Sequence, residues 1–246
     1  VVGGDFSELM VGNVHRFCSK FLFEQGRIPA DSAIIDDEEA VSIIADYRNE
    51  DEEGVTRDFN RYKGYQTIIF FQHFIYQMEH QHPWKYYLHP ESFTDDDREA
   101  VKHICASQKI EYDEQAVVNI YHHAQEYMDE ANAPGLDGKT ADRIRVLLWK
   151  MYYANCYARY KEENHLFDFE DLLLYTYDIY RSDPTCKRYP WIQVDEVQDL
   201  NGMQLAIIDL LTAEDNPMVM YLGDEQQAIF SFMGAKVETL TLLKMR

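Results

Sequence analysis

Apolar residues recur along much of this chain with the period of an α-helix. In the segment from Asn13 to Leu22 they fall at positions 14, 17, 18, 21 and 22, while Arg16 and Lys20 lie on the opposite side. This spacing places the apolar side chains on one face of a helix. We therefore expect a short strand over Leu9–Gly12 that leads into an amphipathic helix.

The middle of the chain, from Phe59 to Tyr160, shows the same helical pattern and no alternation typical of strands. Its predicted loops are marked by Pro83, by Pro90 and by Ala133-Pro134-Gly135. The segment from Thr140 to Asn164 reads as one long helix. Four aromatic residues in it fall at roughly helical spacing, and we interpret them as core residues rather than a base-stacking platform: Trp149, Tyr153, Tyr157 and Tyr160.

The pattern changes after Asn164. Asp168 reads as an N-cap before acidic first-turn residues, which opens a helix that ends near Tyr180. An apolar strand over 190–196, a helix over 203–211 and a second strand over 218–224 follow within about thirty-five residues. Strand, helix and strand at this spacing form a β–α–β unit, which predicts a parallel sheet.

Composition restricts the class of protein. The 246 residues are 46% hydrophobic and 27% charged, which is typical of a globular protein, and no apolar run approaches a membrane span or a signal peptide. Lys and Arg number 23 against 44 Asp and Glu, a net charge of −21, which excludes a surface that attracts nucleic acid as a whole. Any nucleic-acid contact must therefore be local.

Acidic residues are concentrated between Asp31 and Glu53, where Arg48 is the only basic residue. We interpret this stretch as a solvated helix face followed by an acidic loop over 49–54. The alternative is an electrostatic bumper that keeps DNA on other surfaces.

Cysteine and histidine give weaker signals. The four cysteines are scattered, so we expect buried thiols in a reducing cytosol: Cys18, Cys105, Cys156 and Cys186. Four histidines cluster around Glu79 and Trp84, but their spacing matches no known zinc finger, and we favour surface or core histidines over a metal site: His73, His80, His82 and His89.

Acidic residues follow both strands of the predicted β–α–β unit. Asp195 and Glu196 come after the first strand and Asp224 after the second. Open parallel sheets bind ligands beyond the carboxyl ends of their strands, so these side chains would converge on one crevice. Carboxylates there suit a magnesium–nucleotide site. The simpler alternative is that Asp195 and Glu196 cap the next helix.

Longer sequence motifs favour the magnesium–nucleotide site over helix capping. The run Asp195-Glu196-Val197-Gln198-Asp199-Leu200-Asn201 resembles the Walker B motif of the UvrD/Rep/PcrA-like superfamily-one DNA helicases. The run from Gly223 to Ala235 resembles their next motif. Leu9 to Leu22 and Phe167 to Leu173 resemble two further stretches of the same family. The matches cover the two ends of the chain and leave its helical middle without a motif.

The resemblance implies a role for each matching residue. Asp195 would hold Mg²⁺, Glu196 would activate the hydrolytic water, and Gln227 would sense the γ-phosphate of ATP. The other implied ATP-site residues are Gln198, Asp199 and Asp224, and the implied DNA-binding residues are Asn13, His15, Phe230 and Phe232.

Three positions depart from the family pattern. Met233 replaces the usual Arg, Ala228 the usual Ser and Asn13 the usual Thr. These changes affect DNA contact and coupling rather than the carboxylates that would hold Mg²⁺.

The resemblance also implies the architecture. We expect an α/β fold in which a partial RecA-like P-loop NTPase parallel sheet, formed by residues 1–28 and 165–246, carries a large, mainly α-helical inserted subdomain over 29–164. The chain begins with Val1 rather than Met, and we expect it to be an internal piece of a helicase, without ATPase activity of its own. The phosphate loop and the second motor domain would lie in the rest of the same polypeptide.

One sequence mimics a phosphate loop. Gly138-Lys139-Thr140 is preceded at the usual distance by Ala133 rather than Gly, and the residues before it are acidic and helix-like. We therefore interpret it as a chance match.

The implied function is ATP-dependent DNA helicase or translocase activity, with Mg²⁺ and ATP as cofactors and single-stranded or duplex DNA as partner. We expect a cytoplasmic protein of DNA repair type with no membrane association. The first alternative is a non-catalytic protein-interaction module with vestigial helicase motifs. The second is a helicase fused to a nuclease.

Overall fold

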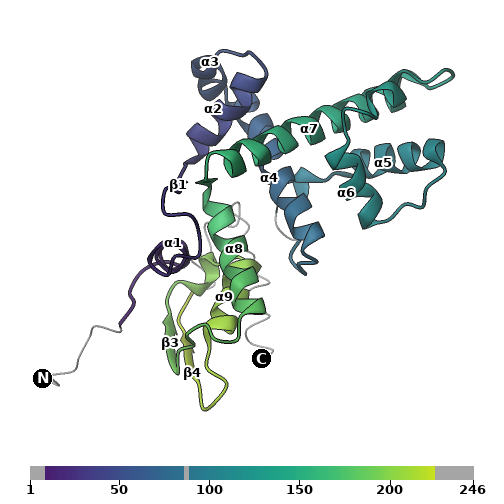
Figure 1. Ribbon diagram of the computed structural model, residues 1–246. Helices are drawn as coiled ribbons and strands as arrows, with labels where there is room; N and C mark the ends of the chain where they lie inside the picture. The colour runs from purple at the N-terminus through teal and green to yellow at the C-terminus, as the bar shows by residue number, and fades with distance from the viewer. Residues whose placement is uncertain (1–8, 86–88, 225–246) are drawn as a thin grey trace, which may run out of the picture. The chain divides into compact units, whose positions relative to one another are not determined.

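The computed structural model describes residues 9–85 and 89–224 (Figure 1). The chain divides into two compact units. Unit 1 combines Val1–Ser32 with Phe169–Arg246, and unit 2 is Ala33–Asp168. Five residues singled out in the sequence lie outside the described residues: Gln227, Ala228, Phe230, Phe232 and Met233.

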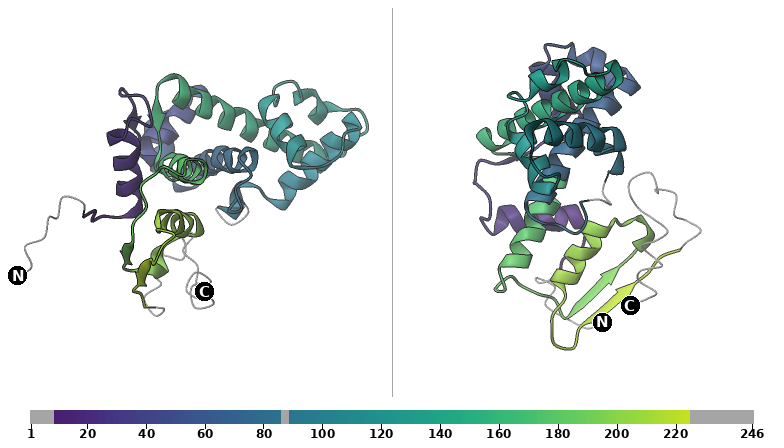
Figure 2. Two further views of the ribbon diagram at one scale, coloured as in Figure 1. Left: turned by 60° about the horizontal axis from the view of Figure 1, so that its bottom comes forward. Right: turned by 90° about the vertical axis from the view of Figure 1, so that its right-hand side faces the viewer.

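Unit 2 is almost entirely helical, which confirms the prediction for the middle of the chain. The long helix α7 packs against α4 and α5, and α2 packs against α4 (Figures 1 and 2). The helices are α2 (Asp37–Tyr47), α3 (Glu52–Arg57), α4 (Phe59–Glu79), α5 (Asp95–Gln108), α6 (Glu114–His122) and α7 (Gly138–Glu163), with short 3-10 helices η1 (Pro90–Ser92) and η2 (Met128–Asn132).

Many acidic residues of unit 2 begin helices. Asp36 and Glu39 form a reciprocal capping box at the start of α2, and Asp51 accepts a hydrogen bond from Gly54 N at 3.0 Å at the start of α3. The predicted acidic loop over 49–54 is therefore partly wrong, because its second half opens a helix. Carboxylates in these first turns also complement the positive end of the helix dipole.

The core of unit 2 lies between α4, α5, α6 and α7, where α7 contributes Ile144, Leu147, Leu148 and Met151, all fully buried. The aromatic stripe of α7 is only partly core. Tyr157 is fully buried, whereas Trp149 is 44% exposed and Tyr153 is half-buried. The buried face of α7 runs along the helix through Leu148, Met151 and Ala154, so Trp149 and Tyr153 lie at the border of that face.

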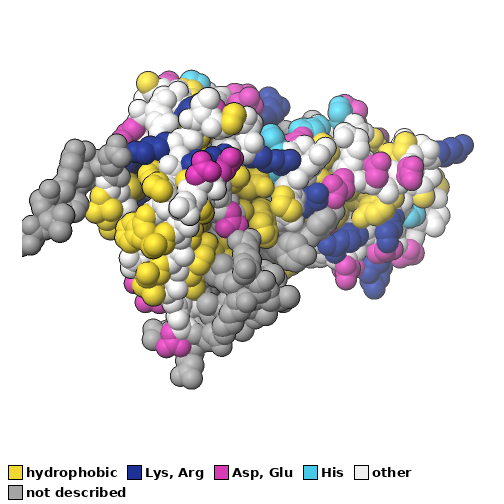
Figure 3. Space-filling model, turned by 90° about the horizontal axis from the view of Figure 1, so that it is seen from below, with side chains coloured by type: hydrophobic (Ala, Val, Ile, Leu, Met, Phe, Trp, Pro, Cys, Tyr) yellow, Lys and Arg dark blue, Asp and Glu magenta, His cyan; other side chains and the backbone are white. Residues whose placement is uncertain are grey.

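Acidic side chains on unit 2 are interspersed with basic ones. Figure 3 shows this mixture on the part built from α5, α6 and the start of α7. Arg98 pairs with Asp95 at 2.8 Å, and Arg143 pairs with Asp96 at 2.6 Å. Short-range pairing of this kind neutralises part of the chain's large negative charge locally.

Two short strands lie at the beginning and the end of the unit 2 sequence. The strands β1 (Ala33–Ile34) and β2 (Leu166–Phe167) pair in parallel. The backbone bonds continue on both sides, since Ala33 N donates to His165 O and Ile35 N donates to Phe167 O, each at 3.0 Å. The first and last residues of unit 2 therefore lie next to each other.

Unit 1 begins with the predicted amphipathic helix, α1 (Val14–Glu24), which packs against α8 (Phe169–Ser182). The Phe21 and Tyr180 rings lie 4.8 Å apart, and Cys18 is fully buried beside them. The strand predicted over Leu9–Gly12 is wrong, because described residues 9–13 are irregular. No described segment pairs with these residues, and a strand needs such a partner to satisfy its backbone.

The predicted β–α–β unit is confirmed. Strands β3 (Trp191–Val194) and β4 (Met218–Tyr221) are parallel, with Trp191 opposite Met218 and Val194 opposite Tyr221. Helix α9 (Gly202–Leu211) connects them and packs on one face of the pair, where Val194, Leu205 and Ile208 are buried.

The thiols follow the prediction with one difference. Cys18, Cys105 and Cys186 are buried and free, and Cys156 is free but half-buried. Within residues 9–85 and 89–224, no helix combines the length and the apolar character that a membrane span requires.

Candidate functional site

The carboxyl ends of β3 and β4 lie side by side in unit 1. The ladder continues past both strands, since Leu222 N donates to Val194 O at 2.8 Å and Val197 N donates to Leu222 O at 3.0 Å. These two bonds bracket Asp195 and Glu196 and hold them next to the segment from Leu222 to Asp224. The backbones of Asp195, Glu196 and Asp224 therefore lie at one edge of the sheet.

Glu196 has an unusual backbone conformation. Its φ of 50° and ψ of 42° lie in the left-handed region, which costs a non-glycine residue about 1 kcal/mol or more. Asp195 supports this turn, because its Oδ1 accepts a hydrogen bond from Glu196 N at 2.9 Å. Both side chains are exposed, so the sharp turn presents two carboxylates to solvent at the end of β3.

Gln198 is buried directly behind these carboxylates. Its side-chain amide donates a hydrogen bond to Glu196 Oε2 and accepts one from Asp224 N at 3.1 Å. Asp199 closes the 3-10 turn η3 (Val197–Asp199) through its own N–H, which donates to Glu196 O at 2.9 Å. The structure thus brings together Asp195, Glu196, Gln198, Asp199 and the backbone of Asp224.

The helix-capping explanation for Asp195 and Glu196 is wrong. The N-cap of α9 is Asn201, whose side chain accepts from Gln204 N while Gln204 returns the bond to Asn201 N, both at 2.9 Å. Glu196 precedes η3 without capping it through its side chain. Neither carboxylate therefore caps a helix through its side chain.

This donor set fits a hard divalent cation. Mg²⁺ prefers carboxylate oxygens and water, and it is usually held by one or two carboxylates. Asp195 uses Oδ1 within the turn, and its exposed carboxylate has no other bond within the part of the chain that the structure describes. Oδ2 of Asp195 is thus placed to bind a cation or a cation-bound water.

The two amino-terminal residues of interest have structural contacts of their own. Asn13 caps α1, since its Oδ1 accepts from Arg16 N at 2.8 Å. The His15 ring meets the Phe169 ring edge-on at 5.9 Å, and burial lowers the pKa of His15. His15 is therefore mostly neutral near pH 7.

Gly138-Lys139-Thr140 lacks the setting of a phosphate loop. The residues form the first turn of α7, capped by Asp137, whose Oδ1 accepts from Thr140 N at 3.1 Å. The preceding element is η2, a 3-10 helix, where a phosphate loop requires a strand.

Replacement of Lys139 by Ala in the full-length polypeptide is expected to leave ATP turnover unchanged. Lys139 is exposed and makes no side-chain bond within the described residues, so the substitution removes no packed or paired group. Steady-state ATPase measurement tests this. Loss of turnover would show that the match is a true phosphate-binding lysine.

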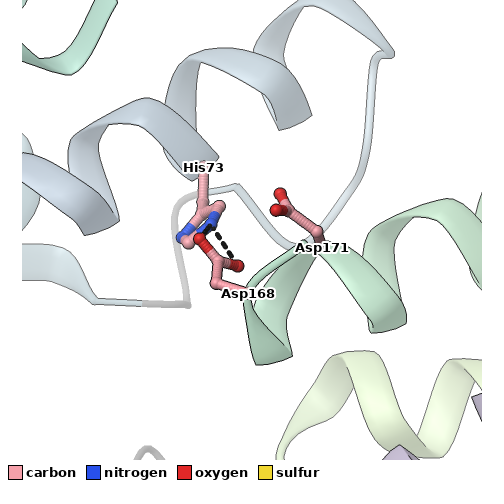
Figure 4. A group of neighbouring side chains, drawn as sticks. All are labelled: His73, Asp168 and Asp171. Carbon is pink, nitrogen blue, oxygen red and sulfur yellow. Dashed lines mark hydrogen bonds and ion pairs between the residues drawn. The ribbon is translucent and has the colours of Figure 1, made fainter. Parts of the chain in front are cut away.

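Sequence analysis missed a buried polar cluster in unit 2. Asp168 accepts a hydrogen bond from His73 Nε2 at 2.9 Å (Figure 4). It also accepts hydrogen bonds from Tyr157 Oη at 2.7 Å and Lys161 Nζ at 2.8 Å. Lys161 also donates to Gln72 Oε1 at 3.0 Å. Burial alone would raise the pKa of Asp168, but His73 and Lys161 outweigh it and hold that pKa well below its usual range. The sequence did contain one signal for this cluster, because Lys161 lies on the buried face of the long helix α7, where a charged side chain needs a buried partner.

The histidines around Glu79 are integrated into unit 2. His73 belongs to the cluster just described, His80 Nδ1 bonds Tyr76 O at 2.8 Å, and the His89 ring stacks on Phe70 with centroids 3.5 Å apart. These contacts agree with the prediction that the histidines are core or surface residues.

Comparison with known proteins identifies the class. The profile of the UvrD/REP helicase N-terminal domain matches residues 2–246. The chain is 36% identical over 97 residues to DNA helicase II of Escherichia coli K12, which covers 37% of this chain and 13% of the relative. It is 24% identical over 160 residues to a probable DNA helicase II homolog of Mycoplasma capricolum, which covers 60% of this chain and 21% of the relative. It is 30% identical over 95 residues to ATP-dependent DNA helicase PcrA of Leuconostoc citreum, which covers 35% and 13%.

The family match makes this mixed α/β chain a helicase domain. The chain belongs to the UvrD/REP helicase N-terminal domain family. Its matches span no more than 21% of the length of these three relatives.

Proposed function

We propose that this chain forms part of an ATP-dependent DNA helicase, in which unit 1 contains half of a nucleotide-hydrolysing site. The observation that supports this most directly is the pairing of β3 and β4, which brings Asp195 and Glu196 beside the backbone of Asp224. The named relatives are DNA helicases, and PcrA is named as ATP-dependent.

Each carboxylate takes a distinct role in this proposal. Asp195 holds Mg²⁺ through the oxygen that is not used in the turn, directly or through water. Glu196 accepts the proton of the water that attacks the γ-phosphate. When bound, Mg²⁺ neutralises charge on the phosphates during transfer.

The remaining roles follow the family pattern. Gln227 senses the γ-phosphate, and Asn13 and His15 lie beside the DNA strand. Phe230 and Phe232 stack on bases, a contact that contributes about 1–3 kcal/mol of binding free energy per base. Unit 1 corresponds to the partial RecA-like core and unit 2 to the helical inserted subdomain. DNA, ATP and the rest of the same polypeptide are the partners.

Replacement of Asp195 by Asn tests the metal role. In the full-length polypeptide with single-stranded DNA, we expect turnover at fixed Mg²⁺ to fall at least about a hundredfold, because metal stabilisation of the transition state is worth several kcal/mol. The activity should recover partly at higher Mg²⁺, as shown by titrating Mg²⁺ in an ATPase assay.

Asp215→Asn is the matched control, since Asp215 is an exposed residue in the turn between α9 and β4. An Asp195→Asn variant with unchanged Mg²⁺ dependence would remove Asp195 from the metal site. If the unaltered polypeptide shows no DNA-stimulated turnover at all, the non-catalytic interaction module becomes the better explanation.

A further inference from the structure

Gln198 connects the ends of the two strands that form the candidate site. We propose that it is a positioning residue for ATP hydrolysis: it orients the Glu196 carboxylate and couples that orientation to the backbone at the end of β4. This inference rests on the proposed function, because it assigns Glu196 a role in hydrolysis.

The contacts of Gln198 point in two directions. On one side its Nε2 donates to Glu196 Oε2, and on the other its Oε1 accepts from Asp224 N at 3.1 Å. The residue is 2% exposed, so its amide is shielded from bulk water. Buried polar groups cost free energy unless they are paired, and here both ends of the amide are paired.

The chemistry of the two partners requires an amide. An ionised carboxylate such as Glu196 can only accept a hydrogen bond, and the Asp224 N–H can only donate one. The connecting side chain must therefore donate at one end and accept at the other, which an ionised Glu, a Lys or a Met of similar length does not do. Asn has the right groups but is one methylene shorter.

The space around Gln198 is equally restricted. A Cβ on Gly223 would lie 2.5 Å from Gln198 Oε1 and 2.7 Å from Val197 Cγ1, both well inside contact distance. Gly223 thus allows the end of β4 to approach the amide closely. A methyl group at Gly223 would push the glutamine away from one or both of its partners.

Coupling follows from this arrangement. Glu196 sits in a left-handed turn with an exposed carboxylate, and Gln198 restrains that carboxylate from the buried side. The same amide holds Asp224 N, three residues before Gln227 in the sequence. A shift of the backbone at Asp224 therefore changes the restraint on Glu196, which links the end of β4 to the residue that accepts the water proton.

Two substitutions of Gln198 test the positioning role in the full-length polypeptide. Gln198→Met keeps most of the volume and removes both bonds, and Gln198→Glu replaces the donor by a group that repels Glu196. For each we expect kcat to fall about tenfold to a hundredfold with the KM for ATP unchanged, since misplacement of a reacting group by about 1 Å costs on this order. Gln204→Glu is the control, because its single acceptor role toward Asn201 N is retained by Glu.

Amide hydrogen exchange gives a readout that does not depend on activity. Gln198→Met and Gly223→Ala should both accelerate exchange at the Asp224 amide, whereas Gln204→Glu should leave it unchanged. Unchanged exchange in Gln198→Met would overturn the bond on which the inference depends. A rise in KM without loss of kcat would also overturn it, since Gln198 would then act in nucleotide binding.

The two hypotheses fail differently. If Glu196→Gln abolishes turnover but Gln198→Met and Gly223→Ala retain it, the proposed function stands and the positioning role is wrong. If Glu196→Gln retains turnover, the proposed catalytic role of Glu196 is wrong, and with it the positioning role of Gln198.

Discussion

Replacement of Glu196 by Gln is expected to lower the DNA-stimulated ATP turnover of the full-length polypeptide by about 10²–10⁴-fold, the range that general base catalysis supplies. The carboxamide has nearly the same size but cannot accept the proton of the attacking water. Glu196 is exposed at the edge of the β3–β4 pair, and the side-chain oxygen of Gln can still accept the hydrogen bond from Gln198 Nε2. Binding of ATP should persist, because the carboxylate proposed to hold Mg²⁺ is Asp195.

Single-turnover ATPase assays and nucleotide-binding titrations separate these effects. The matched control is Glu214→Gln, an exposed residue in the turn after α9 that forms no side-chain bond within the described residues. A Glu196→Gln variant that hydrolyses ATP at the normal rate would exclude Glu196 as the general base. Loss of binding together with turnover would instead assign Glu196 to the metal site.

Periodicity predicted the elements that bury one continuous face. The spacing of apolar residues in α1 and α7, and the two short apolar runs of β3 and β4, were enough to place these elements within a few residues. Predictions failed where an element depends on partners elsewhere. The segment over Leu9–Gly12 has strand-like composition but no pairing partner in the described chain, and α3 begins inside an acidic stretch because Asp51 caps it.

The candidate site was predictable in part for the same reason. Parallel strands place their carboxyl ends at one edge, so Asp195, Glu196 and the segment at Asp224 could be brought together from sequence. The left-handed turn at Glu196 and the buried amide of Gln198 depend on side-chain packing between two strands, which residue spacing does not encode. The Gln227 prediction stays untested.

Replacement of Asp168 by Asn is expected to destabilise unit 2 by about 3–5 kcal/mol, the cost of removing one partner from a buried ion pair. Asp168 is 5% exposed and Lys161 is 4% exposed, and their charged groups lie 2.8 Å apart. Asn keeps the size of the side chain but not its charge, so the Lys161 ammonium loses the Asp168 carboxylate as a buried counter-ion.

Denaturant unfolding of the chain, followed by fluorescence of Trp84 and Trp149 in unit 2, measures this loss. Asp46→Asn, an exposed position on α2, is the control and should change stability by less than about 0.5 kcal/mol. The double variant Asp168→Asn with Lys161→Met should be less destabilised than the sum of the two single variants, because neither member of the Lys161–Asp168 ion pair is then left buried without the other. Additive losses would contradict a direct charge interaction.

The pH dependence of the same measurement has a defined sign. The pKa of Asp168 is held well below its usual value, so its contribution to stability is present above about pH 4, the unfolded-state pKa, and is lost as the pH falls through the folded-state value. The stability difference between the unaltered chain and Asp168→Asn should therefore shrink as the pH falls below about 4. A difference that stays constant down to acid unfolding would show that the substitution acts through packing rather than through the charge of Asp168.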